Sequence, residues 1–239
     1  MNELRTILAG TVTRLFTDRI TTDVRESAEK GQWPEALWQS VEESGLTLPQ
    51  IPEARGGAGG TWQDAYVVVS GAGRFAAPLP LAETIVAAWL LSQAGLDVPM
   101  GPLTIAPAHE GDRLRIERGA LSGTAARVPW GRSAHHVVVL ADGAVALVAA
   151  GHARVEPDAN IALEPRDTLI WDRAPLVAVA PAGPLPAACV PPCDGSARMS
   201  SRARPCDRHR RARAHDVAGR AGDRAALRRP ARARGDVRE

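Results

Sequence analysis

The sequence predicts an α+β fold, in which an N-terminal all-helical domain precedes a small antiparallel β-sandwich or barrel. Apolar residues recur every three to five positions through the first 95 residues, which indicates amphipathic helices. After Gly95 the apolar period shortens to two, which is typical of half-buried strands. From Pro191 onward no period remains, and 14 Arg and ten Ala dominate the last 49 residues. The predicted parts are a helical domain (1–97), a middle β-domain (98–186) and a disordered Arg/Ala-rich tail (187–239).

Four helices are expected in the first part, joined by short connections as in a helical bundle. Pro34 stands where a first helical residue belongs, and Gly45 follows the same helix as its stop signal. Thr61 is an expected N-cap, with Asp64 three residues later as its capping-box partner. The expected helices span 3–29, 33–44, 61–73 and 81–95.

The middle part contains a strong hairpin pattern. In "HVVVLADGAVALVAA" two apolar runs flank Asp142 and Gly143, a pair that suits a tight turn with positive φ. A further alternating segment, "RLRIE", and two short apolar runs, "TLIWD" and "PLVAVA", are expected to add strands, so the pattern favours an antiparallel sandwich or barrel.

The charge is divided unevenly along the chain. The net charge is +2, but residues 191–239 alone hold 14 Arg against six acids, so the first 190 residues carry a net −6. Nonspecific nucleic-acid binding through this basic tail is one alternative function, although the tail has no aromatic residues for stacking on bases.

No apolar run reaches the ~18 residues of a membrane span, and the N-terminus does not resemble a signal peptide. The expected location is the cytoplasm.

Four glycines crowd the last five residues of "IPEARGGAGG", Ile51 to Gly60. A phosphate-binding loop of the Walker type needs a Lys after its second glycine, and a Rossmann fingerprint needs a buried strand before it. Neither is present here. The stretch is therefore expected to be a sharp helix-to-helix connection in which backbones approach closely.

The order of motifs around that connection resembles the N-terminal domain of acyl-CoA dehydrogenases. A helix ending in "ESGL" is followed by "IPEARGGAGG", a helix ending near "GAGR", and "PLPLAET". The likeness covers residues 33–95 well and extends more loosely to about 185. It implies a helical domain, a β-domain and a second helical domain. It also implies FAD-dependent α,β-desaturation of an acyl-CoA thioester, in fatty acid or steroid catabolism, by a homo- or hetero-oligomer.

The resemblance also implies where FAD would contact the chain. The family's flavin-side stretch aligns with "GTAARVPWGRSAH", and its earlier T-E-P motif is reduced to Leu103 and Thr104. The family's hydroxyl donor falls at Pro129, which has neither a hydroxyl nor an N–H. The residues that the resemblance assigns to FAD are Leu103, Thr104, Val128, Pro129 and Trp130.

No carboxylate can be assigned as the catalytic base, which the family places in its C-terminal helical domain. We interpret the Arg/Ala tract as an out-of-frame reading of that domain, so that the chain is truncated and inactive alone. The alternative is a non-catalytic subunit that pairs with a complete dehydrogenase chain.

The tail also holds Cys189, Cys193, Cys206 and His209, but their spacing matches no common zinc motif, and no metal site is predicted.

Overall fold

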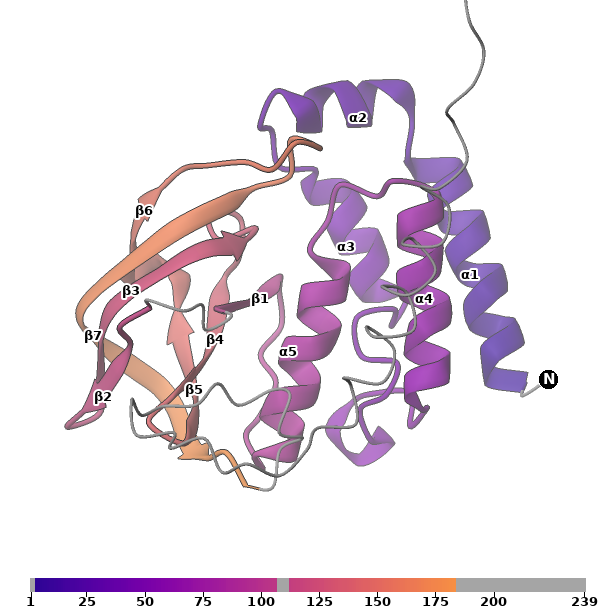
Figure 1. The fold of residues 1–239 in the computed structure, drawn as a ribbon. Helices are drawn as coiled ribbons and strands as arrows, with labels where there is room; N and C mark the ends of the chain where they lie inside the picture. Colours follow the sequence, from indigo (N-terminus) through magenta and orange to yellow (C-terminus); the bar gives the residue numbers. More distant parts are fainter. Residues whose placement is uncertain (1–2, 107–111, 184–239) are drawn as a thin grey trace, which may run out of the picture. The chain divides into compact units, whose positions relative to one another are not determined.

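The computed structural model describes residues 3–106 and 112–183. Within these residues five α-helices come first and seven strands follow, which confirms the predicted α+β class (Figure 1). These helices and strands belong to one compact unit, and the boundary at residue 97 stays a prediction. The expected disorder of residues 187–239, the cysteine cluster and the nucleic-acid alternative concern residues outside the described ranges.

The helices lie close to the expected ranges, with one difference. The segment 3–29 forms two helices, because Thr21 adopts an extended conformation (ψ 169°) and caps the second one. The Thr21 hydroxyl accepts a hydrogen bond from the N–H of Val24 at 3.3 Å, which satisfies a free helix N–H. The helices are α1 (Glu3–Arg19), α2 (Thr22–Glu29), α3 (Glu35–Glu43), α4 (Trp62–Arg74) and α5 (Leu81–Gln93).

The predicted capping box at the start of α4 is confirmed. The N–H of Thr61 donates to the carboxylate of Asp64 at 2.8 Å, and the Thr61 hydroxyl donates to the same oxygen at 2.6 Å. Arg5 of α1 reaches this carboxylate at 3.1 Å. The Asp64 side chain is fully buried, so the capping box also ties α1 to α4.

The glycine-rich connection is a sharp turn, as expected. It contains a short 3-10 helix, η1 (Glu53–Arg55), and Gly56 follows it with φ 83°. A Cβ atom added at Gly57 would collide with the backbone of Ile51, so this position requires glycine. The connection between α3 and α4 therefore folds back on itself, with the backbones of Ile51 and Gly57 in close contact.

The strands form one path in the order β1-β4-β5-β7-β3-β2, with β6 paired to β7. All pairs are antiparallel except β1 with β4, which is parallel. The hairpin at Asp142 and Gly143 is confirmed, with φ 49° and 74°. The strands are β1 (Leu103–Ala106), β2 (Arg115–Glu117), β3 (Ala120–Pro129), β4 (His136–Ala141), β5 (Ala144–Ala149), β6 (Arg154–Glu156) and β7 (Arg166–Pro181).

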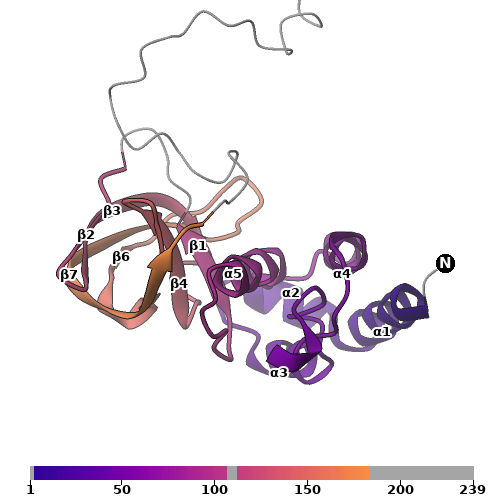
Figure 2. The same cartoon turned by 90° about the horizontal axis from the view of Figure 1, so that it is seen from below.

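Strand β7 corrects one detail of the expected pattern. "TLIWD" and "PLVAVA" are parts of this single strand, which bends at Arg173 (φ 52°) instead of ending there. Its first half pairs with β3 and β6, and its second half pairs with β5. Strand β7 therefore connects the strands β3 and β6 with the strand β5. Figure 2 shows the whole β-structure as a curved layer.

Helix α5 is the helix that packs against the strands (Figure 2). Its residues Ala88 and Leu91 share a buried cluster with Leu103 of β1 and Val138 of β4. A second cluster lies among the helices, and a third fills the interior of the β-structure around Trp171. Helix α5 thus joins the helical layer to the strands.

In the part of the chain that the structure describes, no helix has the length and apolar character to cross a membrane.

Candidate functional site

A pocket of about 720 Å³ lies where the helices meet the turns of the β-structure. Its buried lining is apolar and comes from Leu79, Leu81 and Trp130. Its exposed lining comes from α2 and the following turn, including Arg25 and Lys30, and from the loop 159–165. Small-molecule sites in proteins have this size and this combination of apolar walls with a few polar groups.

Two tryptophans from distant parts of the chain meet in this pocket. Trp33 precedes α3, and Trp130 follows β3; their ring centroids are 6.5 Å apart with an interplanar angle of 70°. Trp130 has a positive φ of 54°, and its N–H donates to the carbonyl of Pro165 at 3.1 Å. The indole N–H of Trp33 donates to the carboxylate of Glu35 at 2.7 Å. The edge-to-face pair gives the pocket a stable aromatic wall.

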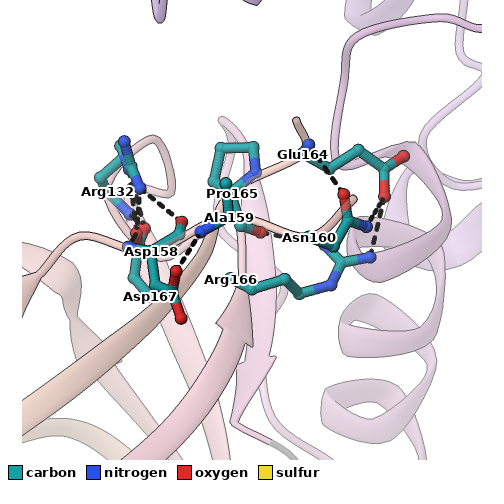
Figure 3. A network of polar contacts seen from close by, with 8 residues as sticks. All are labelled: Arg132, Asp158, Ala159, Asn160, Glu164, Pro165, Arg166 and Asp167. Carbon is teal, nitrogen blue, oxygen red and sulfur yellow. Dashed lines mark hydrogen bonds and ion pairs between the residues drawn. The ribbon is translucent and has the colours of Figure 1, made fainter. Parts of the chain in front are cut away.

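An ion pair with a fully buried carboxylate holds the turn that carries Trp130 (Figure 3). The carboxylate of Asp167, on β7, accepts hydrogen bonds from Nε of Arg132 at 2.9 Å and from the Arg132 backbone N–H at 2.7 Å. The Arg132 guanidinium also donates to the carbonyl of Asp158 at 2.7 Å, and the Asp158 N–H donates to Asp167 at 3.2 Å. Two turns are thus fastened to one strand through a side chain that is itself fully buried.

The loop between β6 and β7 is fixed by a second network, drawn beside the first in Figure 3. The amide of Asn160 donates to the carboxylate of Glu164 at 2.8 Å, and its oxygen accepts the N–H groups of Ala162 and Glu164. Arg166 donates to Glu164 at 3.0 Å and to the carbonyl of Pro165 at 2.9 Å. The loop that lines the pocket is therefore ordered by its own polar groups.

Glu83 is the acidic group of the pocket's inner lining. It stands in the first turn of α5, beside the buried Leu81, and is itself half-buried. Burial raises the pKa of Glu83, while a hydrogen bond from its own backbone N–H and the charge of Arg166 act against this rise. The pocket thus contains a carboxyl group that holds its proton more tightly than an exposed glutamate does.

The five residues assigned to FAD by resemblance separate into two groups. Thr104, Pro129 and Trp130 are brought together, because the Thr104 hydroxyl donates to the Pro129 carbonyl at 2.5 Å. Leu103 and Val128 are fully buried and belong to two different core clusters. Of the five residues, Trp130 is the one that lines the pocket.

These contacts limit how the described residues fit a flavin. Trp130 offers an aromatic surface on which a flat ring can pack. The Thr104 hydroxyl is already donated to Pro129, and Pro129 has no N–H, so neither residue presents a free donor. Trp130 therefore fits the apolar face of a flavin, whereas Thr104 and Pro129 do not supply the hydrogen bonds that its polar edge needs.

The sequence did not reveal Glu83 and Arg132 as pocket residues, or Asp167 as the partner that holds Arg132. Arg132 and Asp167 are 35 positions apart and become partners only through the pairing of β3 with β7. Glu83 resembles any acidic residue in the first turn of a helix, where the helix dipole favours it. The expectation that no catalytic residue can be assigned is not tested by the geometry. Within residues 3–106 and 112–183, no three His, Cys, Asp or Glu side chains gather as metal ligands would.

Comparisons with known proteins give a consistent picture. Residues 2–97 match the family model described as the acyl-CoA dehydrogenase N-terminal domain. The solved structure "Tcur3481-Tcur3483 steroid ACAD G363A variant" is 29% identical over 74% of this chain and 57% of its own chain, with a TM-score of 0.64. The ChsE4-ChsE5 complex from Mycobacterium tuberculosis is 24% identical over 73% of this chain and 55% of its own, with a TM-score of 0.63. No curated protein matches the chain.

A more distant structure shares the fold. Butyryl-CoA dehydrogenase from Megasphaera elsdenii is 14% identical over 76% of this chain and 58% of its own, with a TM-score of 0.59. The chain spans less than two thirds of the length of each of these three structures.

Proposed function

We propose that the chain is a member of the acyl-CoA dehydrogenase family, which the match of residues 2–97 and the 29% identical structure support, and that it forms part of a flavin-dependent enzyme that introduces an α,β double bond into an acyl-CoA thioester. The pocket is the observation that carries this proposal. It has the size of a small-molecule site, an apolar inner lining and an aromatic wall made by Trp33 and Trp130. An acyl group that enters this pocket exchanges water for apolar contacts, which favours binding.

The described residues would bind and orient the acyl group rather than transform it. Leu79 and Leu81 supply apolar walls, and Arg25 and Lys30 place positive charge at the exposed edge, where the phosphates of coenzyme A suit it. FAD supplies the hydride acceptor of the family's reaction when it is bound. Thr104 and Pro129 offer no free donor for its polar edge, so on this proposal those donors and the base that removes the α-proton come from other residues or from a partner subunit.

Of these two sources for the missing groups, we favour a partner subunit. The 29% identical structure and the M. tuberculosis structure both carry two-component names, Tcur3481-Tcur3483 and ChsE4-ChsE5. The exposed Trp62 and Tyr66 of α4, and Val177 and Val179 of β7, offer apolar surface that a partner can cover. We therefore propose a hetero-oligomeric subunit that is inactive alone, with a steroid-derived acyl-CoA as the first substrate to test, because the first of these structures is named a steroid ACAD.

Tryptophan fluorescence tests the binding part of this proposal. The purified full chain is titrated with cholanoyl-CoA, octanoyl-CoA and coenzyme A alone. An acyl-CoA that enters the pocket changes the emission of Trp33 and Trp130, whereas coenzyme A alone leaves it nearly unchanged. Equal responses to all three compounds would exclude the pocket as an acyl site.

A flavin spectrum tests the subunit part. The chain purified alone is expected to lack the FAD band at about 450 nm, and a complex with a full-length dehydrogenase subunit is expected to show it. Acyl-CoA oxidation by an artificial electron acceptor should need both chains. Activity of the chain by itself would overturn the proposed dependence on a partner.

A further inference from the structure

Among the residues that the structure describes, Glu83 is in no ion pair. The nearest charges acting on it are those of Arg166 and Glu164. The Arg166 guanidinium is already bonded to Glu164 and to the Pro165 carbonyl, and Arg132 is bonded to Asp167. The two arginines of the inner loop region are thus committed to other partners.

The Glu83 carboxyl receives no hydrogen bond from any other residue among those that the structure describes; its own backbone N–H is its donor. Its neighbours in the lining are apolar, including Leu79, Leu81 and Ala82. The carboxyl is half-buried and lines the pocket, so it keeps hydrogen-bonding capacity that a bound ligand can use. A ligand that bonds to it inside an apolar pocket gains affinity over one that leaves it without a partner.

We propose that Glu83 is a specificity-determining residue, which hydrogen-bonds a hydroxyl group carried by the apolar part of the acyl chain. This inference rests on the proposed function, since it names the kind of acyl group that the same pocket selects. The pocket then prefers a hydroxylated acyl-CoA to the same compound without the hydroxyl.

A hydroxyl suits Glu83 better than other polar groups do. A hydroxyl both donates and accepts, so it can pair with the carboxylate form and with the protonated form. An ammonium group pairs only with the carboxylate, and burial disfavours that form by raising the Glu83 pKa. A keto group accepts only and pairs with the protonated form alone.

The test uses two pairs of ligands, each differing by one hydroxyl. Lithocholoyl-CoA is compared with cholanoyl-CoA, and 8-hydroxyoctanoyl-CoA with octanoyl-CoA, by tryptophan fluorescence on the full chain. One new hydrogen bond contributes about 1 kcal/mol, which corresponds to roughly five- to tenfold tighter binding of a hydroxylated member. The pair that shows the preference identifies whether a steroid or a fatty acyl group is read.

Two variants separate recognition from packing. E83Q keeps a group that can both donate and accept, so we expect it to retain most of the preference. E83L removes the polar group at similar volume and is expected to bind both members of each pair equally. A wild-type chain without any preference, or an E83L variant that keeps it, would overturn the inference.

The outcomes also distinguish this inference from the proposed function. If no acyl-CoA binds better than coenzyme A, the acyl pocket itself is refuted. If acyl-CoA binds but the hydroxyl makes no difference, the pocket stands and the role of Glu83 is refuted. Should E83L fail to fold, as judged by its thermal unfolding, E83A takes its place, because it also removes the carboxyl group and is expected to bind both members of each pair equally.

Discussion

The hydroxyl of Thr84 donates a hydrogen bond to the carbonyl of Leu103 at 3.0 Å and accepts one from the N–H of the same residue at 3.1 Å. Thr84 lies on α5 and Leu103 on β1, and both are buried. The N–H and the carbonyl of Leu103, the first residue of β1, are thus both satisfied by one helix side chain. This reciprocal pair joins the helical layer to the β-structure beside the predicted FAD residues.

Replacing Thr84 by Val should lower the free energy of unfolding by about 2 kcal/mol, because it leaves a buried N–H and a buried carbonyl without partners. The volume of the side chain hardly changes. T84S keeps the hydroxyl and serves as the matched control, with a smaller loss from one missing methyl group. Denaturant unfolding measures both. Equal stability of T84V and T84S would show that the two hydrogen bonds contribute little.

The Arg132–Asp167 ion pair gives a second prediction. D167A leaves two backbone N–H groups and a guanidinium that is 36% exposed without their acceptor, so the free energy of unfolding should fall by about 2–3 kcal/mol. Asp172 and Arg173 form a matched control pair on the same strand, with both side chains almost fully exposed. D172A should change stability by less than about 0.5 kcal/mol. A similar loss in both variants would argue against a special role for the Arg132–Asp167 pair.

The difference between local and non-local contacts explains how far the sequence could predict the structure. The helices, the capping box at Thr61 and the hairpin at Asp142 depend on local patterns, and the structure has them, with the expected helix 3–29 divided into two. Strand β3 was not predicted, because "ALSGTAARVP" has few β-branched residues and is held as a strand by pairing with β7. Non-local pairing is invisible to a local pattern.

The pocket was unpredictable for the same reason. Trp33, Glu83, Trp130 and Glu164 come from four separate segments, and no spacing in the sequence connects them. Of the residues assigned by resemblance, Trp130 does line the pocket, whereas Leu103 and Val128 are buried in the core. The resemblance thus located the region, and the fold decides which side chains face it. Their roles in FAD binding stay predictions.

Asp64 predicts how stability changes in acid. Hydrogen bonds from the side chain and backbone of Thr61 lower the pKa of Asp64, and the bond from Arg5 lowers it further, against a smaller opposing effect of burial. An acid with a lowered pKa in the folded state stabilises the fold above its unfolded value of 3.8, and this contribution is lost as the pH falls through the lowered pKa.

The D64N variant should therefore be less stable than wild type at neutral pH, and the difference should shrink as the pH falls below about 3.8. Thermal unfolding at a series of pH values measures this. T61A should cost about 1 kcal/mol through the loss of the helix cap, at neutral pH. A D64N difference that stays constant into acid would refute the assigned hydrogen bonds.

Glu83 gives a prediction of opposite sign. Its pKa is raised by burial, so the folded chain keeps this proton at pH values where the unfolded chain has lost it. The charges that act on the Glu83 carboxyl are those of Arg166 and Glu164. The comparison variant E83Q leaves these and the other charged groups of the pocket unchanged, which are Arg25, Glu29, Lys30 and Arg132.

The contribution of Glu83 to stability is fully present below its unfolded pKa of 4.5 and is lost as the pH rises through the raised value. E83Q cannot titrate, so the free energy of unfolding of wild type relative to E83Q should fall over this interval and then level off. Denaturant unfolding between about pH 4 and pH 8 measures the difference. A difference that rises with pH would mean that Glu83 is stabilised as a carboxylate. A hydroxyl-bearing ligand would then be bound by an ionised acceptor, and the preference for it should be largest at high pH.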